Sequence, residues 1–288
     1  MNGNFEIKDG EYTSTIYTLI KEQRYIEAIN ILNYIYDSNP TSRAALSLLA
    51  YCYYYMQDYV NAANCYEQLS HHHPDQEDYR VYYAQSLYAA TLYEEAMKVT
   101  VTVESAEHQG SMLKLQAAIR YGEEDLAGAK SLVDQCPPDD TDTEINLACL
   151  LYKEGRYSEA LSKYSSAQNL VGYDAHLSYN IALCHYRLKD FAQALKHIAD
   201  IIERGIRDHP ELSVGMQTEG IEVRSVGNTL TLHKTALIEA FNLKAAIEYL
   251  LKNQEAAREA LTDMPPRSEN ELDAVTLHNQ VRLRTVLS

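Results

Sequence analysis

The sequence predicts an all-α protein in which helix hairpins repeat along the chain and stack on one another. Three observations support this prediction. A Tyr-x-x-Ala motif recurs at steps close to 34 residues, a second small residue stands twelve positions before the Ala of each motif, and turn residues separate the two halves of a repeat. A period of this length is typical of arrays of small helical units that bury their apolar faces against their neighbours.

The motif marks the second helix of each predicted repeat. Its copies stand at Tyr25/Ala28, Tyr59/Ala62, Tyr93/Ala96, Leu126/Ala129, Tyr157/Ala160, Phe191/Ala194 and Gln254/Ala257. Because a period near 34 residues with two helical halves is typical of tetratricopeptide repeats, we expect a right-handed superhelix of about seven helix hairpins with one irregular insertion.

The first helix of each repeat is marked by a small or branched residue. These residues are Ile16, Ala50, Ala84, Ala117, Ala148, Ala182 and Ala245. Two helices approach closely only where their side chains are small, so we expect each of these residues at the crossing point of its hairpin. Apolar residues spaced i, i+3, i+4 and i+7, as in "ALSLLAYCYYYMQ" and "EINLACLLYKEG", predict the buried side of the first helix around them.

Turn residues separate the helices. "QD", "EG" and "KD" stand between first and second helices, and Pro40 and Pro74 end second helices because proline cannot continue them. Three histidines, His71 to His73, stand directly before Pro74. Adjacent side chains on a helix point apart and cannot all face one metal ion, so we expect these histidines in the last turn and exit of a second helix. We predict no metal site and no cofactor.

The repeat period breaks once and then resumes. We assign residues 1–204 to repeats one to six, 205–230 to an irregular insertion, 231–267 to repeat seven and 268–288 to an incomplete, truncated repeat. The insertion contains four glycines, a proline and β-branched residues, a composition that does not suit a helix pair. Ile221, Val223 and Val226 alternate with polar residues there, so we expect a structured segment that buries them.

Charge and composition restrict the class of ligand. Lys plus Arg number 25 against 41 Asp plus Glu, a net charge of −16, which argues against nucleic acid or anionic lipid and favours basic or neutral polypeptides. No apolar run approaches the roughly 18 residues of a membrane span, and the start "MNGNFEIKDG" lacks the pattern of a signal peptide. We therefore predict no membrane insertion. The five cysteines are odd in number and lack CxxC spacing, which favours a reduced, intracellular protein.

Tyrosines form the first candidate binding site. Eight residues before the Ala of the motif stand Tyr54, Tyr88, Tyr121, Tyr152, Tyr186 and Tyr249. This offset places them near the end of the first helix, beside the groove that the first helices of such repeats normally line. Phenol rings there can stack on the proline rings of a bound chain while their hydroxyls stay hydrated. The alternative is that these rings pack neighbouring repeats together.

Asparagines form the second candidate site. Asn146 and Asn180 are in phase along the first helices, Asn242 is one residue out of phase, and Asn279 follows in the last segment. An amide donates and accepts hydrogen bonds, so a row of amides can bind a peptide backbone whatever its sequence. The alternatives are a hydrogen bond between helices or plain solvent exposure. Tyr17 and Tyr51 face the same side by spacing and are weaker candidates.

Catalytic motifs are missing from the sequence. "SVGNTL" lacks the Lys and second Gly of a phosphate-binding loop, and neither GxSxG nor HExxH occurs. Cys52, Cys149 and Cys184 fall in apolar stretches and are expected to be buried, whereas Cys136 is expected in an exposed loop. We predict that the chain is not an enzyme.

Longer stretches of the sequence resemble one known family. "HIADIIERGIRDHPELSVGMQTEGIEVRSVGNTLTLHKTALIEAFNLKAAIEY" (residues 197–249) and "EALTDMPPR" (259–267) resemble the tetratricopeptide subunit of intraflagellar transport complex B, a family linked to tubulin polyglutamylation. "SLLAYCYYYMQDYVNAANCYEQL" and "LLYKEGRYSEA" resemble the same family. The resemblance covers nearly the whole chain and corresponds to the N-terminal half of a family member.

This resemblance implies a function. It suggests a non-catalytic scaffold that closes around an extended, proline-rich segment of another complex B core subunit and works with the anterograde kinesin motor. It further implies roles in anterograde transport, cilium assembly and, indirectly, axonemal tubulin polyglutamylation, with a location at the cilium (axoneme and base) and in the cytoplasm. The alternative is a generic cytosolic adaptor that binds a peptide or chaperone tail, which requires clustered cations on the first helices. Lys153 and Arg187 are scattered candidates.

Overall fold

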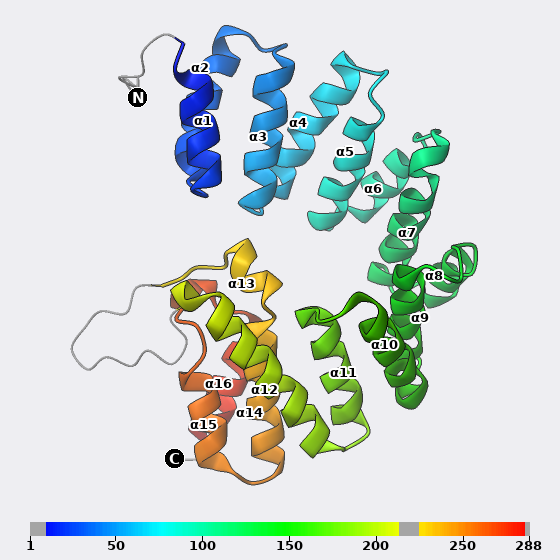
Figure 1. Ribbon diagram of the computed structural model, residues 1–288, viewed down its shortest axis with the longest axis vertical. Coiled ribbons are helices and arrows are strands. Elements are labelled where there is room, and N and C mark those ends of the chain that lie inside the picture. Colours follow the sequence, from blue (N-terminus) through cyan, green and yellow to red (C-terminus); the bar gives the residue numbers. More distant parts are fainter. Residues whose placement is uncertain (1–9, 213–224, 286–288) are drawn as a thin grey trace, which may run out of the picture. The chain divides into compact units, whose positions relative to one another are not determined.

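The computed structural model describes residues 10–212 and 225–285, and these residues form helices and loops without strands (Figure 1). The chain divides into two compact units, Met1–Cys136 and Pro137–Ser288. Each unit is a stack of helix hairpins, which confirms the predicted tetratricopeptide architecture.

Four hairpins make up the described part of the first unit. They are α1 (Tyr12–Lys21) with α2 (Tyr25–Ser38), α3 (Arg43–Tyr55) with α4 (Tyr59–His72), α5 (Asp78–Ala89) with α6 (Tyr93–Thr100), and α7 (Ala106–Gly122) with α8 (Leu126–Val133). Consecutive helices pack on one another along the chain, as expected for a solenoid in which each repeat contacts its neighbours.

Three hairpins, two further α-helices and two short 3-10 helices make up the described part of the second unit. The hairpins are α9 (Thr141–Lys153) with α10 (Tyr157–Val171), α11 (Ala175–Arg187) with α12 (Phe191–Asp208), and α14 (Leu237–Leu250) with α15 (Gln254–Thr262). The other elements are η1 (Pro210–Leu212), α13 (Leu230–Lys234), η2 (Glu269–Glu271) and α16 (Ala274–Thr285). The last helix, α16, packs against both α14 and α15.

The small residues predicted at the crossing points are buried in every repeat. All seven motif alanines are at most 1% exposed, and all seven partners in the first helices are at most 3% exposed. The first residue of each motif is also the first residue of its second helix, from Tyr25 in α2 to Gln254 in α15. The repeat pattern therefore predicted both the core and the helix starts.

The turn inside each hairpin has one backbone conformation. The residue two positions before the second helix has a φ of about +60 to +80° in every hairpin described: Gln23, Gln57, Thr91, Glu124, Gly155, Lys189 and Lys252. The next N–H donates to the carbonyl five residues back, as Asp58 does to Tyr53 at 2.9 Å and Leu92 to Leu87 at 2.9 Å. This is the Schellman ending of a helix, which normally uses glycine. Only Gly155 supplies it here.

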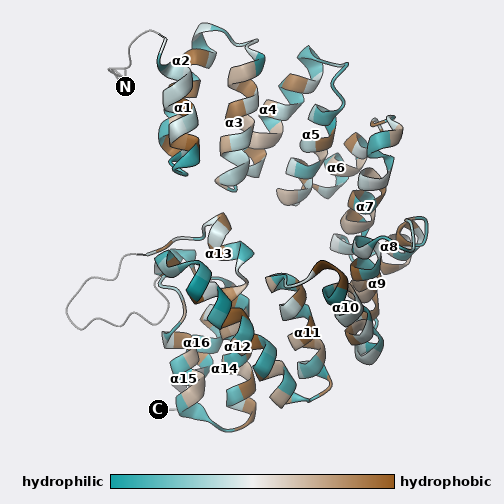
Figure 2. Cartoon of the chain, in the orientation of Figure 1, coloured by the Kyte–Doolittle hydropathy of each residue, from teal (hydrophilic) through white to brown (hydrophobic). Residues whose placement is uncertain are grey.

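Apolar clusters run through each unit. In the first, Leu32, Leu46 and Leu69 join α2, α3 and α4, and in the second, Ile198 and Ile247 join α12 and α14. Figure 2 shows a broad hydrophilic face on α12, whose buried residues, Ala194, Ile198, Ile201 and Gly205, form a single stripe.

The segment predicted as irregular is partly helical. Helix α12 continues to Asp208, beyond the predicted boundary at residue 204, and η1 follows it. Val226 packs against the cluster of Leu212, Leu232 and Phe241, and its N–H donates to the carbonyl of Pro266 at 2.9 Å. Ile221 and Val223 lie outside the described residues. The domain boundaries between repeats six and seven stay a prediction.

Two smaller predictions have clear outcomes. His71 and His72 occupy the last turn of α4 and His73 caps it, as expected. Cys136, predicted in an exposed loop, is only 6% exposed, because it follows the short helix α8 and its thiol points back to the carbonyl of Leu132. Over residues 10–212 and 225–285, no helix is long and apolar enough to cross a membrane.

Candidate peptide-binding face

The first helices of the repeats define one surface in each unit, which we call the helix-one face. It consists of α1, α3, α5 and α7 in the first unit and of α9, α11, α14 and α16 in the second. Each predicted column tyrosine is the penultimate residue of its helix and is half-buried: Tyr54, Tyr88, Tyr121, Tyr152, Tyr186 and Tyr249. Their position at the end of the first helix is as predicted. Contact with a ligand stays a prediction.

Most column tyrosines also pack inside their own repeat. Tyr54 contacts Tyr59 with ring centroids 5.2 Å apart, and Tyr152 contacts Tyr157 at the same distance. Tyr88–Tyr93 and Tyr186–Phe191 repeat the contact at 5.8 and 6.1 Å. The partner is always the aromatic residue that begins the second helix, five positions later. One side of each of these four rings therefore packs against the second helix of its own repeat. The burial that results raises the pKa of the Tyr54 hydroxyl.

The first unit adds an aromatic cluster at its second repeat. Tyr51 and Tyr55 lie with ring centroids 4.3 Å apart, and Tyr25 contacts Tyr55 at 6.0 Å. Tyr51 as a whole is 37% exposed, but its hydroxyl is partly desolvated and hydrogen-bonds with Tyr55. Both effects raise the pKa of Tyr51, to about 12. Tyr17, on α1, is 58% exposed. These rings offer flat apolar surface to a partner.

The second unit combines tyrosines with arginines on its helix-one face. The guanidinium of Arg187 lies 5.8 Å from the ring centroid of Tyr152 and 5.6 Å from that of Tyr157, and its Nε donates to the Tyr152 hydroxyl at 3.1 Å. Arg282 lies 4.9 Å from the ring centroid of Tyr249. In each case the arginine comes from the next first helix, about one repeat later. Arg282 was not among the residues predicted from the sequence, although its distance of about one repeat from Tyr249 could have indicated the contact.

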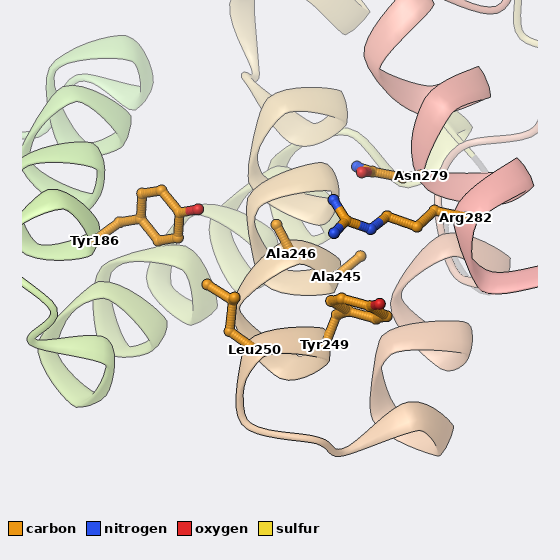
Figure 3. Close-up of a pocket in the computed structure, with 7 residues that line it drawn as sticks. All are labelled: Tyr186, Ala245, Ala246, Tyr249, Leu250, Asn279 and Arg282. Atoms are coloured by element: carbon orange, nitrogen blue, oxygen red, sulfur yellow. The ribbon is translucent and has the colours of Figure 1, made fainter. Parts of the chain in front are cut away.

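Tyr186 and Tyr249 line a common pocket (Figure 3). Its other lining residues are Ala245, Ala246, Leu250, Asn279 and Arg282, and its volume is about 90 Å³. The pocket joins α11, α14 and α16, which are three first helices of the same unit. The pocket brings the predicted residues Tyr186 and Tyr249 together with Asn279.

The asparagines do not form one continuous ladder. Asn146 and Asn180 are half-buried on α9 and α11, whereas Asn242 is 5% exposed. The Asn242 amide donates to the Thr276 hydroxyl at 2.8 Å and accepts from Asn279 at 2.8 Å. Its role is thus the hydrogen bond between helices that the sequence left as an alternative. Because its amide is buried and bonded to these partners, Asn242 is not accessible to a bound peptide.

The helix-one faces provide aromatic rings, amides and guanidinium groups along successive repeats. Such a set suits an extended polypeptide, since rings bind apolar and proline side chains and amides bind the peptide backbone. Among the residues that the structure describes, no group of three His, Cys, Asp or Glu side chains is placed to hold a metal ion.

The sequence matches a known protein family. The family model described as Intraflagellar transport protein 56 matches residues 46–217, more than half of the chain. Intraflagellar transport protein 70A of Xenopus tropicalis is 69% identical over 275 residues, which cover 96% of this chain and 42% of that protein. Intraflagellar transport protein 70B of Homo sapiens is 57% identical over 286 residues, covering 96% and 43%. This chain therefore spans less than half the length of these relatives.

Solved structures share the fold. A tetratricopeptide repeat protein from Parabacteroides merdae superposes with a TM-score of 0.65 at 13% identity, covering 96% of this chain and 98% of that one. The APC/C hetero-tetramer Cut9-Hcn1 contains a chain with a TM-score of 0.56 at 14% identity, covering 99% of this chain and 50% of that one. Identities this low establish the shared fold alone.

Proposed function

This chain belongs to the tetratricopeptide repeat family of intraflagellar transport proteins, and we propose that it acts as a non-catalytic scaffold subunit of intraflagellar transport complex B. In this role it binds an extended, proline-rich segment of another core subunit along its helix-one faces. The complex then supports anterograde transport and cilium assembly and, through delivery of a modifying enzyme, axonemal tubulin polyglutamylation. Its place of action is the cilium, at the axoneme and base, and the cytoplasm.

One observation carries the binding part of the proposal: aromatic rings recur at the same position of successive first helices. The recurring step matches one repeat, and an extended chain laid across the repeats meets a new ring at each. Proline rings fit such surfaces because a polyproline helix is already ordered and loses little entropy on binding. The half-buried rings are also held in place by the aromatic residues that begin the second helices.

The overall charge supports a polypeptide ligand. A net charge of −16 repels nucleic acid and anionic membranes over distances up to a Debye length. The aromatic and amide groups of the helix-one faces carry no charge, so they suit a proline-rich segment. The anterograde kinesin motor is a further partner of the assembled complex in this proposal.

Binding to purified subunits tests this function. The chain is mixed with each of the other complex B core subunits in turn, and complexes are detected by size-exclusion chromatography and quantified by calorimetry. We expect a stable complex with at least one subunit. A short, proline-rich peptide from that subunit should bind the chain as well. Absence of any complex, with a full-length relative as positive control, would contradict the proposed function.

Variants of the column tyrosines test the binding surface. Tyr186→Leu keeps apolar volume but removes the flat ring, and an aromatic contact contributes about 0.5–1.5 kcal/mol beyond its buried area. We therefore expect Tyr186→Leu to weaken the complex about two- to tenfold. Tyr34→Leu is the matched control, because Tyr34 is 57% exposed on the second helix α2. Equal affinities for both variants would place the bound segment elsewhere.

A further inference from the structure

The pocket between α11, α14 and α16 has one apolar side and one polar side. Its apolar side consists of the ring of Tyr186, the side chain of Leu250 and two alanines, Ala245 and Ala246. The small alanines leave the space that larger residues would fill. Figure 3 shows the Tyr186 ring and the guanidinium of Arg282 on opposite sides of this space. None of the seven lining residues is acidic.

Arg282 is held in place by its contact with an aromatic ring. Its guanidinium lies over Tyr249, 4.9 Å from the ring centroid. The electron-rich ring face attracts the cation, and the guanidinium borders the pocket with its planar set of N–H donors. Because the side chain is already ordered by this contact, it loses less entropy when it binds a ligand.

A hydrogen-bond chain through the buried Thr276 and Asn242 orients the second polar group, Asn279. Asp273 accepts the hydroxyl proton of Thr276 at 2.6 Å, so the Thr276 oxygen accepts from the Asn242 amide nitrogen at 2.8 Å. The oxygen of Asn242 then accepts from the amide nitrogen of Asn279 at 2.8 Å. A carboxylate only accepts hydrogen bonds, so Asp273 sets the direction of the whole chain.

Asp273, the first acceptor of this hydrogen-bond chain, is itself held in place by its neighbours. Burial raises the pKa of Asp273, but hydrogen bonds from Thr276 and Arg267 outweigh it and keep the pKa below its ordinary value. The Arg267 side chain is only 3% exposed and lies 2.9 Å from the Asp273 carboxylate. Since the Asn279 nitrogen points at Asn242, its amide oxygen points away from Asn242. The pocket thus has a hydrogen-bond acceptor on Asn279 beside the donors of Arg282.

We propose that this pocket binds the carboxylate side chain of an Asp or Glu residue within the extended peptide, which makes an acidic residue part of the recognised sequence. The inference rests on the proposed function and adds a specificity to it. Arg282 donates to the carboxylate, the Asn279 oxygen accepts a backbone N–H of the peptide, and the alanines and Tyr186 contact the apolar part of the acidic side chain. A protein with a net charge of −16 repels acidic ligands in general. At this pocket the lining holds an arginine and no acidic residue, so a single carboxylate is attracted there.

A peptide array provides the probe. Fifteen-residue peptides tiling the other complex B subunits span about 50 Å when extended, long enough to cross several repeats. All are acetylated and amidated, so no terminal carboxylate is present. Each binder is also made with single Asp→Asn and Glu→Gln changes. Affinities for the whole chain and for Arg282→Gln are then measured in solution.

We expect one acid-to-amide change in a bound peptide to weaken binding to the chain about three- to tenfold, the range of a charge-assisted pair near a surface. The Arg282→Gln variant should bind the acidic peptide with that same loss and should no longer distinguish acid from amide. Arg282→Lys should retain part of the discrimination, because it keeps the charge without the planar fork. Arg204→Gln is the matched control. Arg204 also lies over a tyrosine ring, 4.1 Å from the centroid of Tyr173, but it belongs to the second helix α12 and not to the helix-one face.

The possible results separate the two proposals. Peptides that bind equally well with acid or amide, or that lose equal affinity for both forms on Arg282→Gln, overturn the acidic subsite and leave the scaffold function intact. Failure of every peptide to bind, while a whole subunit still forms the complex, overturns this inference alone; failure of the whole subunits as well overturns the proposed function.

Discussion

A methyl group added at Gly205 tests how closely α12 packs on α14. Gly205 lies in the last turns of α12 and is buried. A Cβ at this position would lie 2.7 Å from Cδ2 and 2.9 Å from Cγ of Leu237, at the start of α14. Nonbonded carbons prefer separations of about 3.5–4.0 Å, so the two helices would have to separate by roughly 1 Å.

Two opposing effects set the magnitude of the Gly205→Ala change. Overpacking a filled core costs about 1–3 kcal/mol, and Leu237 is 0% exposed, so it cannot turn outward to relieve the contact. Alanine also favours the helix by about 1 kcal/mol over glycine. Since the collision involves Cγ as well as the end of the side chain, we expect the collision to dominate. The free energy of unfolding should fall by about 1–2 kcal/mol.

The assay is urea unfolding followed by circular dichroism, with the slope of the transition compared between variants. Gly110→Ala is the matched control, because Gly110 lies inside α7 and a Cβ there would meet nothing within 4 Å. This control should be more stable than the parent by about 0.5–1 kcal/mol. A Gly205→Ala variant that is as stable as the parent, or that gains stability together with Gly110→Ala, would show that α12 and α14 leave room for the methyl group.

Two further predictions concern a turn and a carboxylate. Thr91 has a φ of +61°, a backbone conformation that disfavours a β-branched residue. In urea titrations, Thr91→Gly should therefore raise the free energy of unfolding by about 0.5–1 kcal/mol, whereas Gly155→Ala, at a φ of +82°, should lower it. A lower free energy of unfolding for Thr91→Gly would contradict this prediction. Backbone N–H groups of Glu104 and Ser105 donate to the Glu77 carboxylate and lower its pKa below the ordinary 4.5. The lowered pKa means that this stabilisation is complete above pH 4.5 and is lost as the pH falls through the folded value. The difference in melting temperature between the parent and Glu77→Gln should therefore be largest near pH 7 and should close in acid; a pH-independent difference would show that the charge is not involved.

The sequence predicted the repeat scaffold well because its pattern is local and periodic. An Ala such as Ala62 or Ala160 is required wherever two helices cross closely, so it recurs at a fixed step and can be counted. The starts of the second helices followed from the same motif. The hairpin turns lie at the predicted "QD", "EG" and "KD", but their backbone conformation did not follow from the sequence, since Gln57 and Lys189 adopt the left-handed conformation that glycine usually supplies.

The candidate site was predicted only in part. The tyrosine column was visible from spacing, but spacing does not show that Tyr186 and Tyr249 share a pocket while Tyr54 packs on Tyr59. The asparagine ladder failed at Asn242 because a helix position one residue out of phase turns about 100° away from the shared face. Its amide consequently joins α14 to α16 inside the core.

By itself, the sequence determined the hairpins, their order, their buried alanines and their tyrosines, because each depends on residues within one repeat or its neighbour. Only the tertiary structure decided which polar groups are buried partners and which line a pocket. Arg267, Asp273, Thr276, Asn242 and Asn279 act as one hydrogen-bonded chain across three segments. The direction of such a chain depends on the three-dimensional position of every donor and acceptor in it, which no periodicity in the sequence encodes.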